Sequence, residues 1–216
     1  MSNGAAGVHN PIFAHWIFPR LSALEEARGG AENRQELLAG LSGRVIEIGA
    51  GNGLNFRHYP RSVSEVVATE PERYLRSLAI ETAKAATVPV RVVDGVAENL
   101  PMEAASFDAG IASLVLCSVA NPARVLAELH RVIRPGGVLR FYEHVGASSP
   151  GLALIQRILE ATIWPRLGGG CHPTRDTRGA IERAGFVIER CREFMFRPCP
   201  LLFASAPHIL GVARRP

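Results

Sequence analysis

A short apolar run that ends in a glycine-rich turn constrains the fold of this chain more than any other feature. Residues 44–53 read RVIEIGAGNG. An apolar run of this length followed by glycines is typical of a buried strand that leads into a tight loop. Glycine adopts positive φ at little cost and leaves no side chain between the backbone and a ligand. The third glycine, Gly53, comes one residue too early for the dinucleotide-binding fingerprint.

From Val45 onward, strand-like and helix-like segments alternate, which predicts a mostly parallel α/β sheet with helices on both faces. The seven expected strands are 45–48, 63–69, 90–93, 107–114, 138–142, 186–190 and 207–213. The expected helices are 123–133, 152–164 and 177–184, and helical periodicity extends over 21–41. We therefore divide the chain into an N-terminal helical lid segment, 1–42, and one α/β domain, 43–216.

Composition excludes several classes of protein. The 216 residues are 47% hydrophobic and 20% charged, which is typical of one globular domain. The net charge is +4, but the basic residues are scattered, so we expect no nucleic-acid partner. We expect no membrane span and no secretory signal, because no long apolar run occurs. The four cysteines lack metal-type spacing, so we expect free thiols, no metal and a cytoplasmic location.

An acid at the end of the second expected strand is a candidate ribose ligand. Glu70 follows Gly53 by 17 residues, and Pro71 comes next. A carboxylate offers two acceptor oxygens and so can accept both hydroxyls of a ribose. The alternative is an ordinary loop acid. The position relative to the glycine loop favours the ribose role, with Pro71 packed near the base.

Four motifs in order give the chain a family resemblance. They are the acid and glycines of 47–53, Glu70, the segment 94–101 with Phe107-Asp108, and the turn 131–137. This series resembles the class I S-adenosylmethionine (SAM)-dependent methyltransferases over residues 44–144. The chain also looks like the microsomal alkyl-thiol methyltransferases and their bacterial relatives in four segments, 113–119, 143–145, 170–175 and 207–211. Those enzymes belong to a broader group that includes the ubiquinone/menaquinone C-methyltransferases. The animal enzymes have a hydrophobic N-terminal anchor, whereas this chain shows no such run.

The resemblance implies a Rossmann-like fold with an antiparallel last strand, and SAM as the cofactor. It implies that Glu47 contacts the methionine end of SAM and that the Ala97 N–H contacts the adenine. An acid that often binds the adenine amine is replaced here by Val96, so that partner is left to Asp94 or a backbone carbonyl. The full predicted cofactor site is Glu47, Gly49, Ala50, Gly51, Gly53, Asn55, Glu70, Pro71, Gly95, Val96, Ala97, Glu98 and Leu114.

The implied reaction is transfer of a methyl group to a small apolar acceptor of thiol, phenol or quinol type, by in-line displacement. His144 follows the fifth expected strand and is a candidate general base or substrate orienter, with a purely structural histidine as the alternative. Cys117 is the second catalytic candidate, and the alternative is that its thiol is buried and inert. The apolar residues 9–18 suit a lid or a peripheral membrane contact equally well.

Two other functions remain open at this point. A nicotinamide-dependent oxidoreductase shares the glycine loop and the ribose acid, but the glycine spacing and residues 94–108 argue against it. A non-catalytic SAM-fold binding module is the second alternative, and the intact glycine loop argues against that function.

Overall fold

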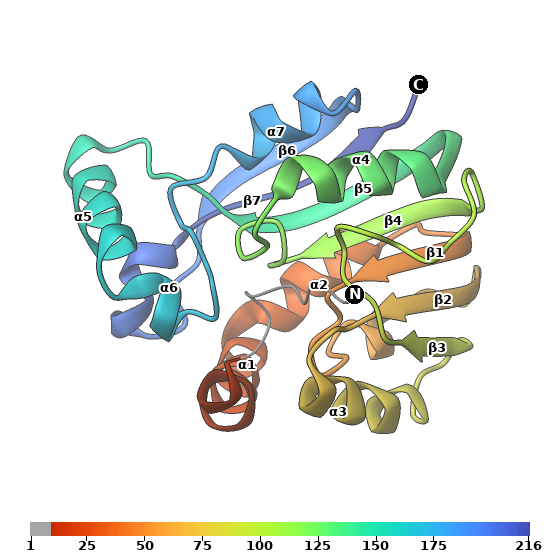
Figure 1. Cartoon of the computed structure of the whole chain (residues 1–216), viewed down its shortest axis with the longest axis horizontal. Helices are drawn as coiled ribbons and strands as arrows, with labels where there is room; N and C mark the ends of the chain where they lie inside the picture. Colours follow the sequence, from red (N-terminus) through yellow and green to blue (C-terminus); the bar gives the residue numbers. More distant parts are fainter. Residues whose placement is uncertain (1–9) are drawn as a thin grey trace, which may run out of the picture.

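The computed structural model describes residues 10–216. Its centre is one seven-stranded sheet in the order β3-β2-β1-β4-β5-β7-β6 (Figure 1). The strands are β1 (Gly43–Ile48), β2 (Val63–Thr69), β3 (Val90–Val93), β4 (Phe107–Ser113), β5 (Ile133–His144), β6 (Val187–Met195) and β7 (Pro207–Arg214).

Strands β1 to β5 are parallel to one another. Strand β7 lies between β5 and β6 and is antiparallel to both. Helix α3 connects β2 to β3 and helix α4 connects β4 to β5, which are pairs of parallel neighbours. Such connections are usually right-handed crossovers. The predicted fold class, a mostly parallel Rossmann-like sheet whose last strand is antiparallel, is confirmed.

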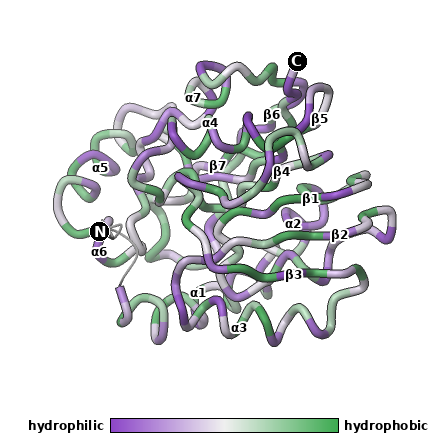
Figure 2. The backbone as a smooth tube through the Cα atoms, turned by 45° about the vertical axis from the view of Figure 1, so that its right-hand side comes forward, coloured by the Kyte–Doolittle hydropathy of each residue, from purple (hydrophilic) through white to green (hydrophobic). Residues whose placement is uncertain are grey.

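Helices cover both faces of the sheet (Figure 1). They are α1 (Phe18–Glu25), α2 (Ala31–Leu38), α3 (Arg73–Ala83), α4 (Pro122–Val132), α5 (Pro150–Ala161), α6 (Trp164–Leu167) and α7 (Thr177–Arg183). Successive strand residues point to opposite faces, so Val45 packs in the core beneath α2 and α3 while Ile46 packs in the core beneath α4 and α7. Figure 2 shows hydrophobic residues along the central strands that separate these two cores.

Helices α5 and α6 stand apart from the two layers, beyond the ends to which the parallel strands point (Figure 1). A 3₁₀ segment, η4 (Pro200–Ser205), packs against α5. The buried Gln156 of α5 anchors this unit, because its Nε2 donates to the Ala204 carbonyl at 2.8 Å. Ligands of open α/β sheets bind at the carboxyl ends of the strands, so this unit borders the predicted site.

Several strand boundaries differ from the sequence prediction. Strand β4 ends one residue early, because Leu114 has a φ of +59° and leaves the extended conformation. Strand β5 begins at Ile133, since the predicted turn at Gly136 stays paired through its N–H to the Arg215 carbonyl at 2.8 Å. Strand β6 continues to Met195 because it pairs with β7 along that whole length.

The helices differ from the sequence prediction more than the strands do. Helix α3 was not predicted: only Leu75 and Ala79 of it are buried, so its apolar stripe is narrow. The expected helix 152–164 begins at Pro150 and stops at Ala161, and α6 follows as a separate turn. The helical region 21–41 is interrupted at Gly29, where φ is +109°.

The predicted lid segment, 1–42, has its first nine residues outside the described part of the chain. Its described part is a π-helical turn, η1 (Phe13–Ile17), then α1, the turn η2 (Glu26–Gly30) and α2. Among residues 10–216, no helix combines the length and the apolar character that crossing a membrane requires.

Candidate functional site

The loop after β1 has the backbone that its glycines predict. Gly49, Gly51 and Gly53 have φ values of +58°, +57° and +81°. Side chains rarely tolerate this conformation, so the loop depends on glycine at each of these positions. The chain here turns tightly over the end of β1 and presents bare backbone at the carboxyl edge of the sheet.

A buried polar network supports this loop from below. Glu47 accepts from Asn55 Nδ2 at 2.8 Å and from the Tyr59 hydroxyl at 2.7 Å. Asn55 Oδ1 in turn accepts from Arg34 Nη1 at 2.9 Å. Burial raises the pKa of Glu47 to about 7, against the opposing effect of these hydrogen bonds. Both Glu47 and Asn55 are only 2% exposed, so their direct contact with a cofactor stays a prediction, whereas their support of the loop is visible.

Glu70 lies directly beside the glycine loop. Its Oε2 accepts from the Gly51 N–H at 2.8 Å, and its Oε1 accepts from the Glu72 N–H at 2.9 Å. Burial raises the pKa of Glu70 to about 7, although both backbone hydrogen bonds oppose this. Each carboxylate oxygen retains a second lone pair. Arg76, which sequence reasoning missed, donates to the Glu70 and Pro71 carbonyls, both at 2.8 Å.

Residues 95–98 follow β3 and lie, like Glu70, at the carboxyl edge of the sheet. An ideal Cβ on Gly95 would meet the Thr69 side chain at 3.6 Å, which places this segment against the end of β2. Ala97 is buried, while Val96 and Glu98 are half-buried. Asp94, the proposed substitute for the missing acid, forms an ion pair with Arg76 at 3.2 Å.

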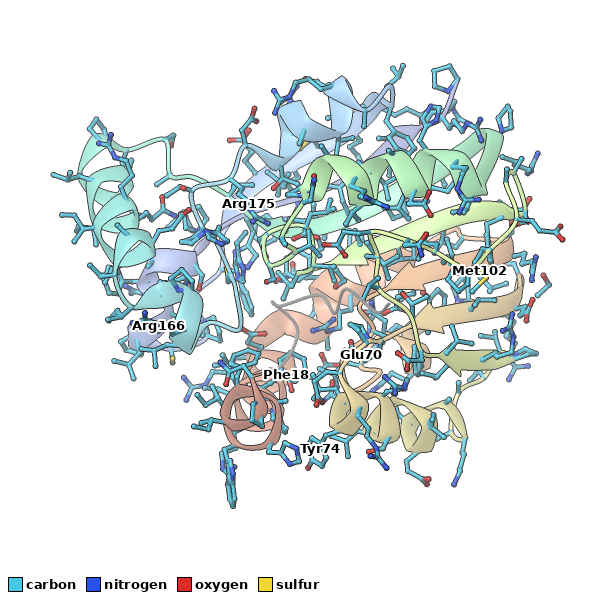
Figure 3. All side chains as sticks on the ribbon, in the orientation of Figure 1. Phe18, Glu70, Tyr74, Met102, Arg166 and Arg175 are labelled. Atoms are coloured by element: carbon cyan, nitrogen blue, oxygen red, sulfur yellow. The ribbon has the colours of Figure 1, made fainter. Side chains whose placement is uncertain are left out.

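The N-terminal helix covers the glycine loop. An ideal Cβ on Gly51 would lie 2.8 Å from Cζ of Phe18, so this ring rests directly on the loop. Figure 3 shows Phe18, Glu70 and Tyr74 gathered between α1 and α3. His15 stacks on Tyr74 with ring centroids 3.8 Å apart. On its other side the helix reaches the loop after α6, where a Cβ on Gly169 would clash with the Phe13 ring.

The segment after β4 is held by one carboxylate. Glu143, near the end of β5, is fully buried and accepts from the backbone N–H groups of Val115, Leu116 and Cys117 at 3.0, 2.9 and 3.1 Å. Burial raises the pKa of Glu143 although these three bonds oppose it. The acid was overlooked in the sequence beside His144, but it determines the path of the chain that carries Cys117.

Three side chains meet at the carboxyl edge next to this segment. His144 Nδ1 is 3.5 Å from Cys117 Sγ and 3.4 Å from Cys171 Sγ. A hydrogen bond from Cys117 holds the pKa of Cys171 well below its usual value despite burial, with His144 as a further cause. The same bond raises the pKa of Cys117. Burial disfavours the charged imidazole, but the nearby Cys171 outweighs burial and raises the pKa of His144.

Aromatic rings and one acid surround this cluster. The His208 ring lies 4.6 Å from that of His144 and 5.2 Å from that of Tyr142, centroid to centroid. Burial lowers the pKa of His208 to about 3. Glu25 of α1 has its pKa raised, mainly by burial, and the charge of His144 opposes that shift. The N-terminal helix therefore brings an acid toward the cluster, a contact between distant segments that the sequence did not indicate.

Comparison with known proteins identifies the family to which this chain belongs. A family model described as "Methyltransferase domain" matches residues 46–141. Thiol S-methyltransferase TMT1B of Rattus norvegicus is 38% identical over 185 residues, 82% of this chain and 73% of that protein. Thiol S-methyltransferase TMT1A of Homo sapiens is 36% identical over 190 residues, 84% and 75% of the two chains. A solved SAM-dependent methyltransferase of Thermotoga maritima is 21% identical, covers 95% of this chain and 98% of its own, and has a TM-score of 0.70.

The chain belongs to the class I SAM-dependent methyltransferases. Within that class it falls in the group of the thiol S-methyltransferases TMT1A and TMT1B, and it is 30% identical over 140 residues to a ubiquinone/menaquinone C-methyltransferase of Syntrophotalea carbinolica. Its cofactor is SAM, and the oxidoreductase and non-catalytic alternatives are not favoured.

Proposed function

We propose that this enzyme methylates a small thiol. The observation that carries the proposal is the 38% identity to a thiol S-methyltransferase across 82% of the chain. A sulfur acceptor also suits the acceptor side of the site, because a thiol near neutral pH already has a thiolate fraction and needs little base catalysis. When bound, SAM supplies an electrophilic methyl group on a sulfonium. The protein then mainly has to orient the acceptor in line with the bond that breaks.

The residues at the carboxyl edge fit such a cofactor. The loop carries no side chain at Gly49, Gly51 or Gly53, where a Cβ would clash with Val115, Phe18 and Phe56 respectively. Next to it, the buried Glu70 carboxylate has two lone pairs free for ribose hydroxyls. We assign the ribose to Glu70, the methionine end to the loop of residues 49–53 and the adenine to residues 95–98.

A screen of acceptors tests the proposed reaction. Purified full-length protein is incubated with labelled SAM and an alkyl thiol, a phenol or a quinol, and transfer of label is measured. We expect the alkyl thiol to be methylated fastest. If only the phenol or the quinol accepts label, the thiol assignment is wrong while the methyltransferase assignment stands.

Cofactor affinity should depend on the ionisation of Glu70. Because the pKa of Glu70 is about 7 in the free protein, its carboxyl is neutral below that pH and loses acceptor capacity. The dissociation constant of SAM should therefore rise by up to about tenfold for each pH unit below 7, which means weaker binding. Calorimetric titration between pH 6 and 8 measures this. In Glu70→Gln the affinity should be lower at pH 8 and should vary less with pH; an unchanged pH profile would rule out Glu70 as the titrating group.

We propose that residues 10–25 act as a lid over both halves of the site. The contacts of Phe18 with Gly51 and of Phe13 with Gly169 support this. Deleting residues 1–20 should leave SAM affinity largely intact but reduce thiol turnover by roughly tenfold, because the lid excludes water. Ile80→Ala, an exposed change on α3, is a matched control that should keep full turnover. A truncated protein that works at the full-length rate would refute the lid.

We also propose that the lid end of the molecule contacts a membrane surface peripherally, with the protein otherwise in the cytoplasm. Large exposed apolar side chains lie on or next to η1, α5, α6, η4 and the end of β6. Helices α5 and α6 lie together beyond the strand ends (Figure 1), η4 packs on α5, and η1 reaches the loop after α6 through Phe13. The exposed apolar side chains are Ile12, Trp16, Leu154, Ile155, Ile158, Ile163, Leu167, Met195, Leu201 and Phe203. Exposed arginines stand among them: Arg20, Arg157, Arg166 and Arg197. Apolar side chains mixed with basic ones favour an anionic bilayer.

Vesicle flotation tests this contact. The protein should float with vesicles that contain anionic lipid and should remain behind with neutral ones. The double substitution Trp16→Ala and Ile158→Ala should reduce flotation several-fold, because both side chains are exposed and apolar. The matched control is Val187→Ala, an exposed apolar residue on β6 away from this end. Equal flotation of wild type and double variant would exclude this face.

A further inference from the structure

We propose that Cys117, His144 and Cys171 form a site for a divalent metal ion of the zinc class, with an open coordination position that takes the sulfur of the acceptor. The metal site stands on the geometry alone. The role of the open position rests on the proposed thiol methylation.

The three side chains already have the spacing of a tetrahedral site. Their ligand atoms all lie within 4.8 Å of one another. The two Sγ atoms are 3.5 and 3.4 Å from His144 Nδ1. Zinc bonds of about 2.3 Å to sulfur and about 2.0 Å to nitrogen, at tetrahedral angles, hold sulfur and nitrogen roughly 3.5 Å apart. An ion can therefore enter between the three atoms with little movement of the protein.

The chain segments that carry these side chains are fixed to one another. Glu143 holds the Cys117 N–H, and the Cys117 carbonyl accepts from the His172 N–H at 2.7 Å. Arg175 Nη1 donates to the Leu116 carbonyl at 2.6 Å. These bonds tie the loop that carries Cys171 directly to the segment after β4. A site assembled before the ion arrives binds it with less loss of conformational freedom.

The donor set selects the kind of metal. Two thiolates and one imidazole suit zinc and exclude the hard cations that prefer oxygen. Among residues 10–216, no carboxylate belongs to this group of ligand atoms. Three protein ligands leave a fourth tetrahedral position for another ligand, which is the pattern of catalytic rather than structural zinc.

Hydrogen-bond donors stand beside both sulfurs. Ser118 Oγ is 3.6 Å from Cys117 Sγ. The buried Trp164 Nε1 has no hydrogen-bond partner in the described part of the chain. It lies next to Cys171: a Cβ on Gly168 would touch Trp164 Nε1 at 3.3 Å and Cys171 Cβ at 3.4 Å. Donors around a thiolate ligand tune its charge and orientation, as outer-shell groups do in metal sites.

The fourth position would account for activation of a thiol acceptor. Cys117, His144 and Cys171 would hold the ion. The bound ion would lower the pKa of an acceptor thiol, so that its proton would pass to solvent and its sulfur would be held for attack. Transfer would form the new S–CH₃ bond as the C–S bond of the sulfonium breaks with its electrons left on the departing sulfur, and the neutral thioether product would be a weaker ligand than a thiolate.

Metal titration of the reduced, full-length protein tests the site. Protein stripped with a chelator should bind one Zn²⁺ per chain with a dissociation constant below about 1 μM. Co²⁺ in its place should give a thiolate-to-metal charge-transfer band. Each of Cys117→Ser, His144→Asn and Cys171→Ser should weaken Zn²⁺ binding by at least about 100-fold. Cys191→Ser and Cys199→Ser, outside the cluster, should bind as the wild type does.

Several outcomes would overturn the site. Reduced wild-type protein that takes up no Zn²⁺ and shows no Co²⁺ band refutes it without any variant. So does a Cys117–Cys171 disulfide in air-exposed protein, if the reduced form fails to bind the ion. Equal loss of binding in the Cys191 and Cys199 variants places the ion elsewhere. SAM binding by each variant shows that it is folded.

Turnover separates this inference from the proposed function. If metal-free protein methylates thiols at the full rate, acceptor activation by the ion is wrong while thiol methylation stands. If the protein binds Zn²⁺ at the cluster but methylates no thiol, the proposed function fails while the metal site stands. Loss of thiol turnover on stripping and its return with Zn²⁺ supports both.

Discussion

Gly51→Val is expected to abolish SAM binding. Gly51 has a φ of +57°, which disfavours any side chain, and a Cβ there would lie 2.8 Å from the Phe18 ring. The added methyl groups would also occupy the loop surface on which we place the cofactor. We expect a loss of at least about 100-fold in affinity, equal to roughly 2.7 kcal/mol. Calorimetric titration with SAM measures it.

The control for this substitution is Gly151→Val. Gly151 lies in the first turn of α5, its φ is not positive, and a Cβ there meets nothing within 4 Å. This variant should bind SAM as the wild type does. If Gly51→Val folds and keeps its affinity, the cofactor does not lie on the glycine loop.

Glu143→Ala should cause the largest loss of stability of any single change around the site. It removes the acceptor of three buried backbone N–H groups, on Val115, Leu116 and Cys117. Each buried donor left unsatisfied costs about 1–3 kcal/mol, so the free energy of unfolding should fall by at least about 3 kcal/mol. Urea denaturation followed by circular dichroism measures this. Turnover should fall as well, since Cys117 loses its position.

Glu81→Ala is the matched control for this loss. Glu81 is exposed and pairs only with Lys84 one turn away, so its removal should change the free energy of unfolding by less than about 0.5 kcal/mol. A Glu143→Ala variant as stable as this control would show that the segment after β4 keeps its path without the carboxylate.

The backbone of the predicted cofactor loop and its contact with Glu70 could be predicted because their signals are local. The positive φ of three glycines follows from a short stretch of sequence that adjoins a strand. Glu70 was found by its place at the end of the second strand, and its contact with Gly51 agrees with that place. Helix α3, between β2 and β3, was missed because so little of it is buried.

The acceptor half could be predicted only in part. His144 and Cys117 were named from their places after strands, but Cys171 was not joined to them. Each of the two cysteines is 27 residues from His144 in the chain, and their meeting depends on the path of the loop after α6. No spacing rule covers such distances, so the expectation of no metal rested on local patterns alone. The contacts of Phe18 and Glu25 across the site are equally long-range.

The single N-terminal helix that touches both halves of the site has a kinetic consequence. Phe13 contacts the acceptor-side loop and Phe18 contacts the cofactor loop, five positions apart on one continuous helix. Carrying one ring away by a backbone movement while the other stays would require breaking that helix between them, which costs backbone hydrogen bonds. With residues 10–25 acting as the proposed lid, departure of spent cofactor and departure of methylated product would share one rate constant, that of lid opening, and would respond together to temperature and viscosity.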